Sequence, residues 1–150
     1  RLRENVRRLA LHSVHPIAWD GSIAGSQLFD RVLVDAPCSG TGTLGRHPDA
    51  RWNRGPEQFP ALVERQQSIL DAAFAQLRPG GTLVYSTCSL EHIENEAVVE
   101  NFIAHTPTAR VDEAHRSLPN DERVGRYVQT VPGQHIGDGA FAARIRKVES

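Results

Sequence analysis

The sequence has 150 residues, and its 17 Lys and Arg residues against 18 Asp and Glu residues leave a net charge of −1. A chain of this length suits one domain with a sizeable core, and a hydrophobic share of 39% with 23% charged residues argues against a mainly disordered protein. No apolar run approaches the roughly 20 residues that a membrane helix needs, no secretory signal opens the sequence, and the two cysteines cannot form a disulfide framework, so we expect a cytoplasmic protein that does not enter a membrane.

The first part of the sequence predicts a helix, two strands and a long loop. Apolar residues recur at helical spacing over residues 1–11, which predicts one helix with an apolar face. Residues 14–19 form a short apolar run that ends in a turn, and we expect a strand there. Residues 31–34 are β-branched and apolar, which is typical of a strand inside a parallel sheet that is covered on both faces. Residues 41–55 contain several glycines and prolines without a period and predict an irregular loop.

From residue 56 onward, the pattern alternates between helices and strands. A proline near the start and a Pro-Gly-Gly at the end delimit the first of these helices. The expected elements are a helix at 56–78, a strand at 82–86, a helix at 91–105 with core candidates Ile93, Val98, Phe102 and Ile103, a polar surface stretch at 106–126, and an antiparallel pair of strands at 127–131 and 140–148. This alternation predicts an α/β fold.

Polar residues follow three of the predicted strands, beginning at Asp20, Asp35 and Ser86. Open parallel sheets bind ligands at the carboxyl ends of their strands. If the strands at 31–34 and 82–86 are neighbours, Cys38 and Cys88 reach one cleft. An isolated cysteine is often only a small buried hydrophobe, but two thiols that each follow a strand beside Pro, Ser or Thr favour a chemical role.

The sequence leaves two other thiol chemistries to consider. A zinc site needs about four ligands at short paired spacings, whereas this sequence has no Cys-x-x-Cys and its seven histidines are scattered, so we expect no metal. A dithiol redox pair stays open if the two sulfurs approach each other, although it lacks the same signature.

Two cysteine motifs resemble those of a known family. Residues 35–42, Asp-Ala-Pro-Cys-Ser-Gly-Thr-Gly, resemble motif IV of the Sun-domain RNA cytosine-C5 methyltransferases, and residues 86–89, Ser-Thr-Cys-Ser, resemble their motif VI. The likeness is closest to the bacterial 16S rRNA enzymes and covers nearly the whole chain. It continues through residues 46–49, Trp52, residues 64–70, 77–81, 91–96 and 137–141.

The resemblance implies the Rossmann-like sheet of a class I methyltransferase with S-adenosylmethionine as cofactor. The family's Gly-rich turn and the acidic end of its second strand are not in this sequence, so residues 1–150 are expected to be the C-terminal portion of one such domain, with an incomplete sheet. The first two strands of the family would separate 14–19 from 31–34. We therefore expect an exposed edge at 14–19, with either displacement of the first 25 residues or self-association through that edge.

The resemblance also implies roles for four residues. Cys88 is the nucleophile that attacks C6 of the cytosine, because a thiolate both adds and leaves readily. Cys38 is the residue that the family assigns to product release. Asp20 would contact the adenosine portion of the cofactor, and Asp35 would meet the cofactor edge and the target base. The alternative for Asp20 is a simple turn residue.

The loop at 46–54 is the candidate RNA contact. Basic residues interleaved with an aromatic suit a flexible RNA strand, through phosphate contacts and base stacking. The alternative is a solvated loop whose tryptophan packs down as an anchor. The residues concerned are Arg46, His47, Arg51, Trp52 and Arg54.

These observations predict an S-adenosylmethionine-dependent RNA cytosine-C5 methyltransferase that acts on ribosomal RNA. The 150 residues by themselves are expected to bind the cofactor poorly and to methylate nothing. Two other classes stay open: a catalytically silent RNA-binding module of the same fold, and a thiol redox protein.

Overall fold

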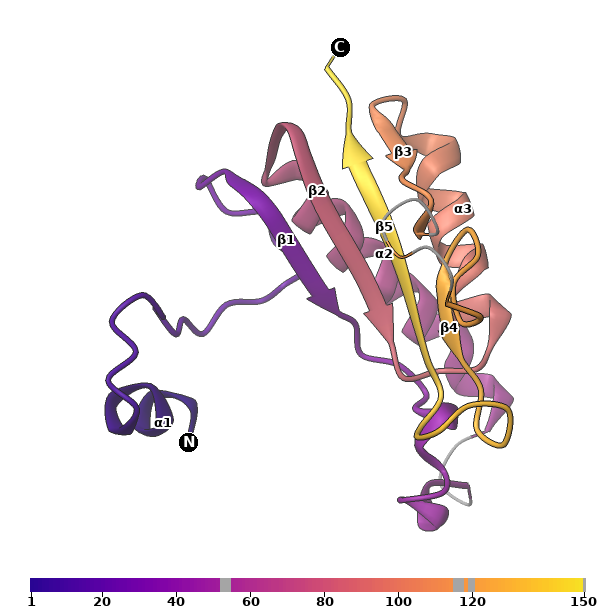
Figure 1. The fold of residues 1–150 in the computed structure, drawn as a ribbon. Coiled ribbons are helices and arrows are strands. Elements are labelled where there is room, and N and C mark those ends of the chain that lie inside the picture. Colours follow the sequence, from indigo (N-terminus) through magenta and orange to yellow (C-terminus); the bar gives the residue numbers. More distant parts are fainter. Residues whose placement is uncertain (52–54, 115–117, 119–120, 150) are drawn as a thin grey trace.

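A sheet with helices on one face forms the main body of the protein (Figure 1). The computed structural model describes residues 1–51, 55–114, 118 and 121–149. The helices are α1 (Leu2–Arg8), α2 (Phe59–Ala75) and α3 (Glu96–His105), with short 3-10 helices η1 (Thr41–Thr43), η2 (Pro48–Arg51), η3 (Pro56–Gln58) and η4 (His92–Glu94). The strands are β1 (Phe29–Asp35), β2 (Leu77–Thr87), β3 (Ala109–Val111), β4 (Val128–Thr130) and β5 (Ala140–Lys147).

The sheet runs in the order β1-β2-β5-β3, and β4 also pairs with β5. β1 and β2 are parallel, with Asp35 opposite Ser86, whereas β5 is antiparallel to β2, β3 and β4. The predicted neighbours at 31–34 and 82–86 and the predicted antiparallel pair near the end of the chain are therefore confirmed. Because β1 and β2 end side by side, the loops that follow them leave the same edge of the sheet.

α2 and α3 cover one face of this sheet and form the core with it (Figure 1). Alternate residues of β2 and β5 point to the helices, since successive side chains of a strand face opposite ways. Phe74 of α2 and Phe102 of α3 meet edge to face, with ring centroids 5.1 Å apart. Fully buried members of this core are Leu70, Leu83, Tyr85, Val98, Val99, Ala143 and Ile145.

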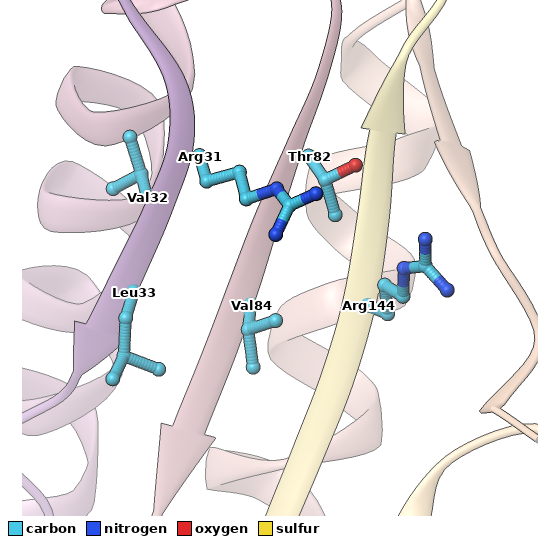
Figure 2. Close-up of a pocket in the computed structure, with 6 residues that line it drawn as sticks. All are labelled: Arg31, Val32, Leu33, Thr82, Val84 and Arg144. Carbon is cyan, nitrogen blue, oxygen red and sulfur yellow. The ribbon is translucent and has the colours of Figure 1, made fainter. Parts of the chain in front are cut away.

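The opposite face of the sheet is open. In the described part of the chain no helix covers it, and Leu33 in β1 is 71% exposed while its neighbour Val34 is 6% exposed. The expectation that this strand is covered on both faces is therefore wrong for the described part of the chain, because no helix there covers the face of Leu33. A hollow of about 550 Å³ is lined by Arg31, Val32, Leu33, Thr82, Val84 and Arg144. Figure 2 shows these six residues on β1, β2 and β5.

The first residues lie away from the sheet, with α1 at a distance from it (Figure 1). α1 contributes no buried side chain. The strand predicted at 14–19 is wrong: a strand needs a hydrogen-bonded neighbour, and none of the described segments pairs with these residues. The displacement expected for the first 25 residues is seen for α1 only, since Gly21 and Gly25 lie close to Ile69 and Gln76 at α2.

Some boundaries also differ from the prediction. β2 begins at Leu77 rather than at residue 82, because Gly80 adopts a φ of +78° and lets the chain bulge while Leu77 already pairs with Phe29. Within the stretch predicted as a polar excursion, β3 pairs with β5. In the described residues no helix is both long and apolar enough to span a membrane.

The start of the second predicted helix is a 3-10 turn. η4 precedes α3, and this change of period rotates the side chains relative to a continuous helix. Ile93, a predicted core residue, is consequently 47% exposed, whereas Glu94 is fully buried. Val98 and Phe102 are buried as predicted.

Candidate active site

Two thiols meet where β1 and β2 end. The Sγ atoms of Cys38 and Cys88 lie 3.2 Å apart, and the backbone N–H of Cys88 donates to Cys38 Sγ at 3.3 Å. Both side chains are partly buried, and both are reduced, since the distance is well beyond the roughly 2.05 Å of a disulfide bond. The expectation that the two cysteines come together is confirmed.

Glycines let the loop after β1 run close to other segments. Gly40 adopts a left-handed φ of +68°, which starts η1. The N–H of Gly42 donates to the carbonyl of Cys88 at 3.0 Å, and its own carbonyl accepts the N–H of Gly139 at 2.9 Å. A Cβ on Gly42 would collide with the backbone of Gly139. The loop of Cys38 is therefore fixed against the loop of Cys88 and against the turn before β5.

A buried polar network accompanies the thiol pair. Glu94, Ser39, Ser89 and Gln66 are all buried, and Glu94 accepts hydrogen bonds from the other three. The sequence reasoning did not single these residues out. The sequence does show one sign of this network, a serine directly after each cysteine. It does not show that Glu94 is buried, because a continuous helical period places Ile93 in the core instead.

Burial changes the acidity of one thiol. The partly buried setting of Cys38, and next its hydrogen bond with Cys88, raise the pKa of Cys38 to about 12. Cys38 is thus a neutral thiol at physiological pH. Burial, and next the negative charge of Glu94, also raise the pKa of Tyr85, which stays a neutral hydrogen-bond donor.

The two predicted cofactor carboxylates are placed differently. Asp35 ends β1 and is exposed at the same sheet edge, three residues before Cys38. Asp20 lies in an exposed turn. Its carboxylate accepts two hydrogen bonds from Ser22, one from the backbone N–H at 3.0 Å and one from the side-chain hydroxyl at 2.7 Å, and these bonds lower the pKa of Asp20. Because no strand forms at 14–19, the expectation that Asp20 stands at a strand end is wrong.

The predicted RNA loop is described in part. Arg46 is 71% exposed, and its Nε lies 3.0 Å from Asp138 Oδ2 in the turn before β5. His47 is exposed. Trp52, Arg54 and the side chain of Arg51 lie outside the described residues. An RNA contact by this loop stays a prediction.

Comparison with known sequences finds one family model and many relatives. The model described as 16S rRNA methyltransferase RsmB/F matches residues 1–146. Ribosomal RNA small subunit methyltransferase B of Vibrio vulnificus (strain YJ016) is 43% identical over 98% of this chain, and the match covers 34% of that protein. This chain therefore spans about a third of the length of the curated relatives that it matches.

Solved structures share this arrangement of strands and helices. The crystal structure of PH0851 matches 98% of this chain and 34% of its own, with a TM-score of 0.88 and 30% identity. NSun6 from Pyrococcus horikoshii, crystallised with SFG, matches 99% of this chain and 38% of its own, with a TM-score of 0.77 and 28% identity.

Proposed function

Because this chain belongs to the 16S rRNA methyltransferase RsmB/F family, we propose that the protein transfers a methyl group from S-adenosylmethionine to C5 of a cytosine in ribosomal RNA. Its sheet is part of the Rossmann-like sheet of class I methyltransferases. We propose further that residues 1–150 are the C-terminal portion of one methyltransferase domain. The observation that carries the function is the pair of thiols 3.2 Å apart at the ends of two parallel strands.

The proposed chemistry needs a nucleophile, because C5 of cytosine is unreactive until a group adds at C6. The Cys88 thiolate forms a bond to C6, and the electron pair of the C5–C6 double bond becomes available at C5. After methylation, a base removes the C5 proton, the double bond returns and the C6–S bond breaks, which frees Cys88. Cys38 acts in this release.

The unequal surroundings of the thiols support this division. A thiolate, not a thiol, is the attacking form, and Cys38 stays protonated at neutral pH because burial raises its pKa to about 12. Cys38 is thus poorly suited to attack C6. Cys38 is suited instead to the release step, in which its S–H is held beside the sulfur of Cys88. The two sulfurs are already within hydrogen-bond distance.

The described residues fit the cofactor in part. S-adenosylmethionine would supply the methyl group to C5. Asp35, exposed at the end of β1, is a carboxylate at the sheet edge where such folds bind ligands, and we propose that it faces the cofactor and the base. NSun6, which shares this fold, was crystallised with SFG. Asp20, in its exposed turn, supports a cofactor contact less directly, and we keep that role as a prediction.

Two cysteine variants of the full-length protein test the proposal. Cys88→Ala should abolish both methylation and the covalent RNA adduct, because no bond to C6 forms. Cys38→Ala should accumulate the adduct, because addition proceeds while release fails. A denaturing gel of each variant with substrate RNA separates these outcomes. An adduct formed by Cys88→Ala would contradict the assignment, and an unchanged cytosine methylation pattern in bisulfite mapping of cells that lack the gene would refute the activity.

One observation also favours a second candidate, a thiol redox protein. The two sulfurs already lie within 3.2 Å, which a dithiol pair requires. Measuring the fraction of Cys38–Cys88 disulfide in buffers at cytosolic redox potentials distinguishes the candidates. A stable disulfide at those potentials would favour the redox protein, whereas a methyltransferase needs both thiols reduced.

A further inference from the structure

Glu94 is a fully buried carboxylate that the proposed chemistry does not use. One oxygen, Oε1, accepts the N–H of Ser39 and the side-chain N–H of Gln66, both at 2.9 Å. The other, Oε2, accepts the hydroxyls of Ser39 and Ser89, at 2.5 and 2.6 Å. Four donors around one buried carboxylate compensate for the loss of water, since a buried charge is unfavourable without such partners.

The donors belong to the two loops that carry the thiols. Ser39 directly follows Cys38, and Ser89 directly follows Cys88. A single carboxylate therefore holds the residue after each cysteine, and the hydroxyls of the two serines lie 3.2 Å from each other. Gln66 also donates to the carbonyl of Pro37 at 2.9 Å, on the other side of Cys38.

Glu94 is itself held in place by rigid elements. The hydroxyl of Tyr85, buried in β2, donates to the carbonyl of Glu94 at 2.7 Å. Next in the chain, Asn95 donates to the carbonyl of Ser89 at 2.9 Å and accepts the hydroxyl of Thr87 at 2.6 Å. The carboxylate thus acts from a fixed point of the core and not from a mobile loop.

We infer that Glu94 is a positioning residue that sets the separation of Cys38 and Cys88 by fixing the loop after each of them. Only the catalytic consequence of this inference rests on the proposed function; the geometric consequence does not. Removal of the carboxylate leaves the donors of both loops without their common acceptor, so the two sulfurs lose their fixed spacing.

The geometric test uses phenylarsine oxide and the full-length protein. Its arsenic binds two thiol sulfurs, and its oxygen leaves as water with the two thiol protons. Tight binding requires two sulfurs that can both reach the arsenic, and a preset short spacing lowers the entropic cost of that step. We expect Glu94→Gln to weaken binding by about fivefold or more, since the spacing is no longer imposed. The matched control is Gln67→Leu, because Gln67 lies on α2 beside Gln66 but donates to the carbonyl of Val98 and not to either thiol loop.

Binding that is equal in Glu94→Gln and in the wild type would overturn the inference, as would an equal loss in Gln67→Leu. Circular dichroism shows whether each variant is folded. If Glu94→Gln does not fold, Ser89→Ala serves as the second variant, since it removes only one hydroxyl that reaches the carboxylate; the same weakening is expected, and unchanged binding again overturns the inference.

The catalytic test measures methylation by the same variants. Glu94→Gln should lower kcat by about tenfold or more with KM for RNA nearly unchanged, because the thiols act after the RNA is bound. A loss confined to KM would contradict a positioning role. Weakened arsenical binding in a protein whose wild type methylates no RNA would leave Glu94 as the positioning residue and refute the proposed function instead.

Discussion

Cys38 and Cys88 have the same side chain but different surroundings. Cys38 is the acceptor of the Cys88 N–H and lies in a setting that raises its pKa to about 12. Two identical groups whose environments differ can take different roles in one reaction, as pairs of carboxylates do in many enzymes. The proximity of the sulfurs alone would not distinguish their roles; the burial that raises the pKa of Cys38 supports a role for it other than attack on C6.

We expect Cys38 to react slowly with iodoacetamide. Its reactive form is the thiolate, and with a pKa of about 12 the thiolate fraction is still rising between pH 8 and pH 10. At pH 8 the labelling of Cys38 should be about tenfold or more slower than that of a peptide with the sequence of residues 35–42. Mass spectrometry of the tryptic peptide that ends at Arg46 measures the rate. A rate that levels off near pH 9, as for an ordinary cysteine, would contradict the raised pKa.

The meeting of the two cysteines could be predicted from the sequence, whereas the carboxylate beside them could not. Each cysteine follows an apolar run, and neighbouring parallel strands bring the ends of such runs together. Glu94 lies where the helical period places a solvent-facing residue and favours Ile93 for the core. The 3-10 turn η4 reverses these positions, and no local pattern marks the burial of Glu94 because its side-chain partners Ser39 and Gln66 are far away in the sequence.

At the scale of elements, the secondary structure of long periodic segments can be predicted from the sequence. That of a segment without a neighbouring strand cannot. α2 and β2 follow their apolar patterns, and both pack into the core. Residues 14–19 have a strand-like pattern too, but a strand is stable only when a neighbour satisfies its backbone groups, which the pattern does not encode. The short strand β3 was missed because its three residues are too few for a periodic signal.

The contact between the Cys38 loop and the turn before β5 leads to a prediction. Gly42→Ala should lower the free energy of unfolding by about 1–3 kcal/mol, because the added Cβ collides with the backbone of Gly139. Gly45→Ala is the matched control, since a Cβ there meets nothing within 4 Å. Urea denaturation of both variants measures the difference. Equal stability of the two would show that the loops move apart without loss.

At the scale of the whole molecule, one face of the sheet is exposed and the N-terminal helix does not pack into the core. α1 has no buried side chain, β1 is an edge of the sheet in the described residues, and Leu33 is 71% exposed. Exposed strand edges and apolar faces favour pairing with another chain. Self-association through an open edge, expected from the sequence for residues 14–19, stays a prediction.

The 150-residue chain should bind S-adenosylmethionine weakly or not at all. Asp20 stands in an exposed turn rather than at a strand end, and Asp35 is a single carboxylate at the sheet edge. Calorimetric titration of this chain should show no saturable heat, whereas the full-length protein should bind the cofactor. Tight stoichiometric binding by the 150 residues would show that Asp20 and Asp35 suffice.

The position of β5 has a consequence for synthesis on the ribosome. β5 is the strand latest in the sequence, yet it lies between β2 and the short strands β3 and β4 (Figure 1). Translation at about 5–20 residues per second delivers both cysteines several seconds before the turn at Gly139 that supports their loops. Throughout that interval the nascent chain has an unpaired edge on β2, and the Cys38 loop lacks its contact with Gly139. All residues of the thiol pair and of the Glu94 network thus leave the ribosome before β5, and the support of the Cys38 loop by Gly139 is the last to form.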